Sequence, residues 1–233
     1  MSFHHLKRYP KEVETEATFG VSAKTGREIV WFYLKKIHAL KDQKIVWPDT
    51  FGDDVWALTV DGTHFWIKEP QHPEFSYNPQ TFSHKFAKAG LNYEIGISLT
   101  DNHVIWMNGP YDGGQNDARV FKDYGLKDKL EEADVKGIGD LGYVGFERLS
   151  VPNSHDSQVV KKFKSRALKR HKKFNGLIKE FECMSGRFRH SLTKFQVYFE
   201  TTCVICQYQI EIDRPLFDIL VHGLLHPYDE EEE

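Results

Sequence analysis

Residues 55–68 read VWALTVDGTHFWIK, and this stretch decides how the chain is expected to fold. Its first six residues are apolar or β-branched, which is the composition of a short buried strand. Asp61 follows directly, and Gly62-Thr63 predicts a turn into a second strand over residues 64–68. An aspartate fixed at the end of a buried strand and followed by glycine is a good position for a metal ligand, because the glycine leaves room for an ion or a substrate.

The rest of the chain supplies strands and helices in a mixed order. Hydrophobic periodicity and turn residues predict helix 23–41, strands 92–99 and 103–107 around a turn at residues 100–102, helix 116–130 with a weak point at Gly125, strand 135–139, and helices 165–182 and 191–211. A helix therefore crosses over between the third and the fourth strand. This order predicts an α/β domain and is compatible with the ribonuclease H-like fold, a mixed sheet with flanking helices.

The sequence is expected to divide into three parts. Residues 1–50 are predicted to be an N-terminal extension with one helix, because residues 1–18 are polar and show no apolar stripe. Residues 51–212 hold the predicted strands and form the main domain. Residues 213–233 are predicted to be a C-terminal extension that ends in an acidic tail, DEEEE.

Composition excludes several classes of protein and shows a marked segregation of charge. The 233 residues are 40% hydrophobic and 28% charged, which excludes a collagen-like or wholly disordered chain. No run of 18 apolar residues occurs, so no membrane span is predicted. The net charge is −3, yet residues 161–194 hold twelve Lys and Arg against Glu180 and Glu182, a net charge of +10. Such a block is found on nucleic-acid-binding surfaces and on solvated helices.

Two further aspartates are candidates to join Asp61 in one site. Asp140 follows the predicted strand 135–139, in IGDLGY, and Asp117 stands near the start of the predicted helix 116–130, in GGQNDARVF. Carboxylates that converge repel one another, and a hard divalent cation such as Mg²⁺ relieves that repulsion. Taken alone, each aspartate is more often a helix cap or a turn residue than a metal ligand.

Five motifs appear along the chain in this order: VDGTHFWIKEPQHP, FSHKFAKAGLNYEIGISL, VIWMNGPYDGGQNDARVF, IGDLGYVG and RHKKFNGLIKEFECMSGRFRH. Together they resemble the DDE-superfamily endonuclease domain of Harbinger-type and related insertion-sequence transposases, over about residues 51–212. The resemblance implies a ribonuclease H-like fold, DNA strand cleavage or transfer, and three carboxylates that bind two divalent ions, Mg²⁺ or Mn²⁺. It implies Asp61 as the first aspartate and Asp140 as the second, with Asp117 as another acid. The choice between Asp117 and Asp140 as the second metal ligand stays open.

One position departs from the family pattern. The last acid of the family is a glutamate on the helix after the fourth strand, and the matching residue here is Lys172, in RHKKFN. At about 4 Å and an effective dielectric of about 20, a like-charge contact between this lysine and a bound cation would cost on the order of 4 kcal/mol. We therefore expect impaired or absent cleavage. The alternatives are a catalytically inactive, domesticated DNA-binding protein, or a globular domain that shares only ancestry with the family.

The basic block supplies the residues expected to contact DNA. These are Arg166, Arg170, Lys172, Lys173, Lys179, Arg187 and Arg189. Active relatives usually carry a DNA-binding helical domain before the endonuclease domain, and only about 50 residues precede it here, so a separate DNA-binding partner protein is expected. A DNA substrate predicts a nuclear protein, or one shared between nucleus and cytoplasm.

Overall fold

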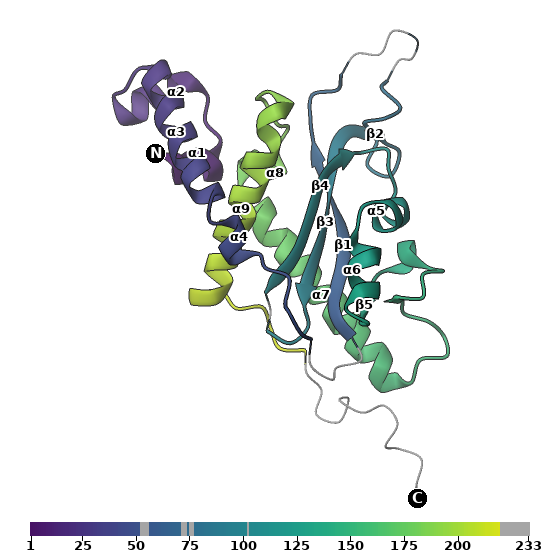
Figure 1. Cartoon of the computed structure of the whole chain (residues 1–233). Helices are drawn as coiled ribbons and strands as arrows, with labels where there is room; N and C mark the ends of the chain where they lie inside the picture. Colours follow the sequence, from purple (N-terminus) through teal and green to yellow (C-terminus); the bar gives the residue numbers. More distant parts are fainter. Residues whose placement is uncertain (52–55, 71–73, 75–76, 102, 220–233) are drawn as a thin grey trace, which may run out of the picture.

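The computed structural model describes residues 1–51, 56–70, 74, 77–101 and 103–219. A six-stranded mixed sheet forms its centre (Figure 1). The strands are β1 (Trp56–Trp66), β2 (Phe82–Ser83), β3 (Lys88–Ser98), β4 (Val104–Asp112), β5 (Lys136–Ile138) and β6 (Leu149–Ser150). β3 is antiparallel to β1, β2 and β4, whereas β5 is parallel to β1 and to β6. This arrangement confirms the predicted α/β class and is consistent with a ribonuclease H-like fold.

β1 is one continuous strand, and the turn predicted at Gly62-Thr63 is wrong. Gly62 pairs with Glu94 of β3 and Thr63 pairs with Tyr93, so the ladder passes through both residues without a break. Asp61 therefore lies in the middle of a strand. Glycine is required at position 62 because the side chain of Asp117 occupies the space that a Cβ atom would fill there.

Helices cover both faces of the sheet, and the alternation of side chains along β1 separates two cores. Leu58 and Val60 pack in a cluster with residues of α5 (Asp117–Asp123) and α6 (Leu126–Glu132). Phe65 packs in the other cluster, with residues of α7 (Gln158–Lys179) and α9 (Phe195–Ile212). Figure 1 shows the two helical layers on either side of the strands. Predicted helix 116–130 is divided at Gly125, which has a φ of 103°, so the predicted weak point is confirmed.

The N-terminal region holds more structure than one helix. It forms α1 (Ser2–Arg8), α2 (Glu12–Phe19), α3 (Ala23–His38) and α4 (Lys41–Lys44), and it packs on α9 and on the short α8 (Glu182–Ser185). Leu6 and Leu34 are fully buried, and His38 and Lys41 both pair with the buried Glu200 of α9. The first two helices escape detection in the sequence because each one buries only one or two residues.

The predicted basic helix is longer than expected and not all of its basic residues face solvent. α7 begins at Gln158, seven residues before the predicted start. Arg170 is completely buried and donates a hydrogen bond to the carbonyl oxygen of Ser98. Its predicted contact with DNA is therefore wrong, because a guanidinium enclosed between a helix and a sheet cannot reach a phosphate. Among the described residues, no helix is long and apolar enough to cross a membrane.

Candidate active site

The parallel pairing of β1 and β5 brings Asp61 and Asp140 to the same position along the strand direction. Ile138, the last residue of β5, lies opposite Thr59 of β1. Asp140 and Asp61 each lie two residues further on, so they are neighbours just beyond the end of β5. Asp140 caps the one-turn helix Leu141–Tyr143, and its Oδ1 atom accepts a hydrogen bond of 2.8 Å from the backbone N–H of Gly142. The turn holds this carboxylate at the end of the strand.

Asp117 reaches the same place from the other side of β1, and glycine makes this approach possible. Asp117 is the first residue of α5, after the N-cap Asn116, whose side chain accepts a hydrogen bond from the N–H of Arg119. A Cβ atom added to Gly62 would lie 2.0 Å from Oδ1 of Asp117. A side chain at position 62 is therefore sterically excluded by Asp117. A Cβ atom on Gly142 would lie 2.9 Å from Asp140 Oδ1 and 4.0 Å from Asp117 Oδ2, which places both carboxylates next to Gly142.

The electrostatics of the cluster follow from this convergence. Burial raises the pKa of Asp61 to about 7, with the negative charges of Asp117 and Asp140 as the next causes. Burial also raises the pKa of Asp117; the charge of Lys85 opposes this shift and that of Asp140 adds to it. Lys85 belongs to the turn between β2 and β3 and is the lysine that most lowers the pKa of both acids. Sequence reasoning missed this lysine, because only the folded hairpin brings it to the acids.

The α7 residue that contacts Asp61 is Asn175. Its Nδ2 atom donates a long hydrogen bond of 3.4 Å to Oδ2 of Asp61, and among the described residues its buried Oδ1 atom has no hydrogen-bond partner. Lys172 lies three residues earlier, exposed to solvent. Residues three apart on a helix are neighbours on its surface, so position 172 borders the position that touches Asp61. One turn beyond Asn175, the loss of part of its hydration lowers the pKa of Lys179, and the charge of Asp61 raises it.

A fourth acid, Glu94, lies beneath the cluster. It is opposite Gly62 in the β1–β3 ladder and is 1% exposed, and its Oε2 atom accepts a hydrogen bond of 3.0 Å from Nε1 of Trp106. Burial raises its pKa to about 8; the Trp106 hydrogen bond opposes that shift and the charge of Asp117 adds to it. This shift favours the protonated form of Glu94. Nothing in its sequence context, NYEIG, distinguishes it from a surface residue of a strand.

The chemistry of the cluster suits a hard divalent cation. Three carboxylates from three elements converge, their repulsion disfavours full ionisation, and the buried amide oxygen of Asn175 lacks a partner in the described part of the chain. These oxygen donors are the type that Mg²⁺ and Mn²⁺ prefer. Among the described residues, no three His, Cys, Asp or Glu side chains are already arranged to hold a metal ion. Binding would therefore require the carboxylates to move toward the ion.

The other residues expected to contact DNA are distributed around α7 and the segment that follows α8. Lys172, Lys173, Lys179, Arg187 and Arg189 are exposed. Arg166 and Lys173 donate hydrogen bonds to the carbonyl oxygens of Asp218 and Pro215, and both lie over the ring of Phe217. These two side chains hold the described part of the C-terminal segment on α7. The acidic tail, residues 229–233, lies outside the described residues.

Comparison with known proteins agrees with this geometry. The model of the DDE superfamily endonuclease family matches residues 60–207. The chain belongs to that family. The match begins one residue before Asp61, includes Asp117 and Asp140, and continues through α7 into α9. Searches of the curated proteins and of the solved structures found no significant match. DDE endonuclease domains generally use divalent metals, and their substrate is DNA; the Harbinger-type assignment stays a prediction.

The burial of Asp61, together with the repulsion within the cluster, predicts that Asp61→Asn stabilises this DDE endonuclease domain at alkaline pH. The folded protein holds a proton on Asp61 up to about pH 7, whereas an unfolded aspartate releases it near pH 4. Proton binding by Asp61 therefore contributes its full stabilisation of the folded protein below about pH 4, and this contribution is lost as the pH rises through about 7. We expect the melting temperature of Asp61→Asn to exceed that of the wild type by roughly 3–8 °C at pH 8, and to equal it near pH 4.

Thermal unfolding followed by circular dichroism, without divalent ions, measures this difference. Asp42→Asn, at an exposed position of the short α4, is the matched control and should leave the melting temperature unchanged at both pH values. A lower melting temperature for Asp61→Asn at pH 8 would show that Asp61 is not under the repulsion described here.

Proposed function

We propose that this chain is a transposase-derived DDE endonuclease domain that cleaves or transfers DNA strands with Mg²⁺ or Mn²⁺, and that Lys172 weakens this activity. The observation that carries the proposal is the convergence of Asp61, Asp117 and Asp140, with the pKa of Asp61 raised to about 7 by burial and by its two neighbours. Like charges are rarely placed together in a partly buried position unless a ligand compensates them. Family membership supplies the substrate class.

Asp61 and Asp140 would hold the divalent ions, with Asp117 as a further ligand. A pair of bound ions stabilises both the attacking and the leaving oxygen of an in-line displacement at phosphorus. The protein fixes these carboxylates through β1, the turn after β5 and the first turn of α5. Lys85 and Lys179, whose charges act on Asp61, come from the β2–β3 turn and from α7 and would attract the phosphates on either side.

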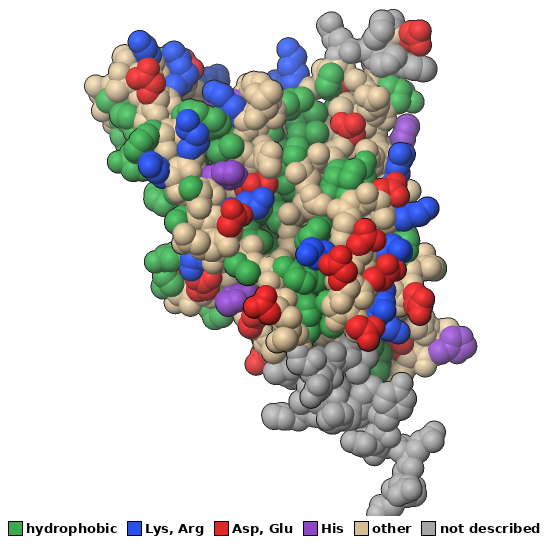
Figure 2. All heavy atoms as spheres, viewed as in Figure 1, with side chains coloured by type: hydrophobic (Ala, Val, Ile, Leu, Met, Phe, Trp, Pro, Cys, Tyr) green, Lys and Arg blue, Asp and Glu red, His purple; other side chains and the backbone are tan. Residues whose placement is uncertain are grey.

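Surface charge supports an approach of DNA along α7. Lys172, Lys173 and Lys179 are exposed on α7, and Arg187 and Arg189 are exposed in the segment after α8, so a polyanion is attracted to this part of the molecule. The exposed acids Asp123, Glu131 and Glu132 of α5 and α6, on the face drawn in Figure 2, are each paired with a basic side chain of the same helix, so this face carries no comparable excess of positive charge. A DNA duplex would therefore enter from the α7 side. We further propose that a separate DNA-binding protein selects the target, and that the chain acts in the nucleus.

A second function is favoured by the lysines of α7. Lys172 stands where the family has an acid, and Lys179 adds another positive charge near Asp61. With this charge balance the fold would bind DNA phosphates without cleaving them. In this alternative the protein is a domesticated DNA-binding protein, and the acid cluster is a remnant.

A nicking assay on supercoiled plasmid tests the first function. Wild-type protein with Mn²⁺ or Mg²⁺ should convert plasmid to the open-circular form at a low rate, and Asp61→Ala and Asp140→Ala should each lower that rate at least 100-fold, because each removes a ligand of the ion. The exposed Asp42→Ala is the control and should nick at the wild-type rate. Equal rates for the wild type and Asp61→Ala would exclude the assigned site.

The variant Lys172→Glu separates the two functions. It changes the charge at the family's acid position from +1 to −1 and should raise the nicking rate at least tenfold, since an added carboxylate strengthens ion binding. Lys169→Glu makes the same charge change at an exposed position earlier on α7 and should not raise the rate. If Lys172→Glu fails to nick and also binds DNA more weakly than Lys169→Glu, the DNA-binding alternative is supported.

A further inference from the structure

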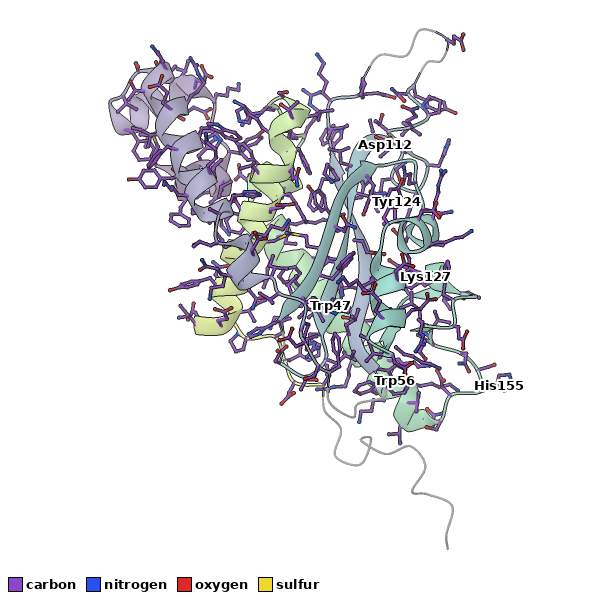
Figure 3. All side chains as sticks on the ribbon, viewed as in Figure 1. Trp47, Trp56, Asp112, Tyr124, Lys127 and His155 are labelled. Atoms are coloured by element: carbon purple, nitrogen blue, oxygen red, sulfur yellow. The ribbon has the colours of Figure 1, made fainter. Side chains whose placement is uncertain are left out.

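A pocket adjoins the acid cluster and shares two residues with it, Gly62 and Asp117. One wall is the turn between β2 and β3, which carries Lys85 and Phe86, and another is the connection from β4 to α5. β4 ends at Asp112, at the opposite end of the sheet from Trp56, where β1 begins (Figure 3). The connection that follows passes back along the sheet to Asp117, and so encloses the space beside the acids.

An exposed aromatic ring forms the first recognition element of this pocket. Phe86 is 45% exposed at the tip of the β2–β3 hairpin, and its ring stacks on the imidazole of His64 with centroids 4.6 Å apart and an angle of 23° between the planes. His64 is itself 8% exposed and is fixed by a hydrogen bond of 2.9 Å between its Nδ1 atom and Oδ1 of Asn92. A large apolar ring is therefore held rigidly at the surface, backed by a second ring.

Neutral polar side chains form the second element. Within the described part of the chain, Nε2 of His64 and Oε1 of Gln115 are buried without a hydrogen-bond partner, and both residues line the pocket. Nδ2 of Asn92 donates a hydrogen bond of 3.2 Å to the carbonyl oxygen of Gln115, which ties the β3 wall to the loop wall. Protein encloses these two atoms, so a ligand in the pocket meets instead the neutral polar side chains of its lining, among them Gln115 and Asn116. These side chains can exchange hydrogen bonds with a ligand that offers donors and acceptors at its edge.

Charge decides which class of ligand fits. Asp117 and Lys85 both line the pocket, so it carries one charge of each sign and has no net charge that selects a free phosphate or another anion. Lys85 is exposed at the rim, 5.5 Å from the centre of the Phe86 ring, where it can turn from the ring to a phosphate outside. The pocket thus combines a flat stacking surface, neutral polar atoms and a cation at its entrance. A nucleobase attached to a DNA backbone has this combination of properties.

We propose that this pocket takes one unpaired nucleobase of the DNA substrate, stacked on Phe86, while Lys85 contacts the adjoining phosphate. This inference rests on the proposed binding of DNA. It adds that the protein recognises a base removed from the duplex stack beside the acid cluster, and that Phe86 provides the stacking surface. The preferred DNA is therefore a strand with an unpaired base next to the position where it would be cleaved.

Fluorescence anisotropy with three labelled duplexes tests the proposal, in Ca²⁺ to limit cleavage. The duplexes are fully paired, paired with one extra unpaired thymidine, and paired with an abasic nucleotide in place of that thymidine. Wild-type protein should bind the thymidine duplex roughly 5- to 100-fold more tightly than the abasic duplex. Phe86→Ala should abolish this preference and keep the affinity for the paired duplex. Phe86→Trp should retain the preference, since it preserves the stacking surface.

Phe32→Ala is the matched control, because Phe32 is similarly exposed on α3, outside the pocket, and should retain the full preference. Equal binding of the thymidine and abasic duplexes by wild-type protein, with normal binding of paired DNA, would overturn the base pocket alone. A preference that survives in Phe86→Ala would overturn it as well. Failure to bind any of the three duplexes would overturn both the pocket and the proposed function.

Discussion

Repulsion among carboxylates is the interaction on which the site depends. Asp61, Asp117 and Asp140 come from a strand, a helix and a turn that are far apart in the sequence, and local structure positions them without an ion pair to any residue that the structure describes. Burial raises the pKa of Asp61 to about 7, and the negative charges of Asp117 and Asp140 add to that shift. The fold therefore maintains a concentration of negative charge that destabilises the protein at neutral pH, which is expected of a site whose function requires a bound cation.

β1 organises this charge because its two faces serve different layers. Thr59 and Asp61 face α7, where Nδ1 of His171 lies 3.0 Å from the hydroxyl of Thr59 and Asn175 contacts Asp61. Gly62 faces α5, and its missing side chain admits Asp117. The Asp61 carboxylate on one face and the glycine on the other allow Asp117 of α5 to approach Asp61 beside this strand. A larger residue at position 62 would move α5 away and separate Asp117 from Asp61.

The sequence predicts the parts of this arrangement that are local. The apolar residues before Asp61, the break at Gly125 and the strand before Asp140 are visible as patterns, and the structure contains each of them. Gly62 is misread as a turn because its requirement is tertiary, and no local pattern records the approach of Asp117. The same limit applies to Asn175 and Lys85, which reach the acids only through helix packing and hairpin folding. Arg170 is misread because a charged residue in a basic helix is normally exposed.

The central claim, that these three acids form one cation site, is tested most directly by diffraction from crystals soaked in Mn²⁺. Anomalous scattering locates manganese without reference to activity, and Asp61→Asn crystals treated in the same way provide the comparison. We predict an anomalous peak between the carboxylates of Asp61 and Asp140 that is lost in the variant. Manganese bound only elsewhere, or equal peaks in both crystals, would contradict the claim.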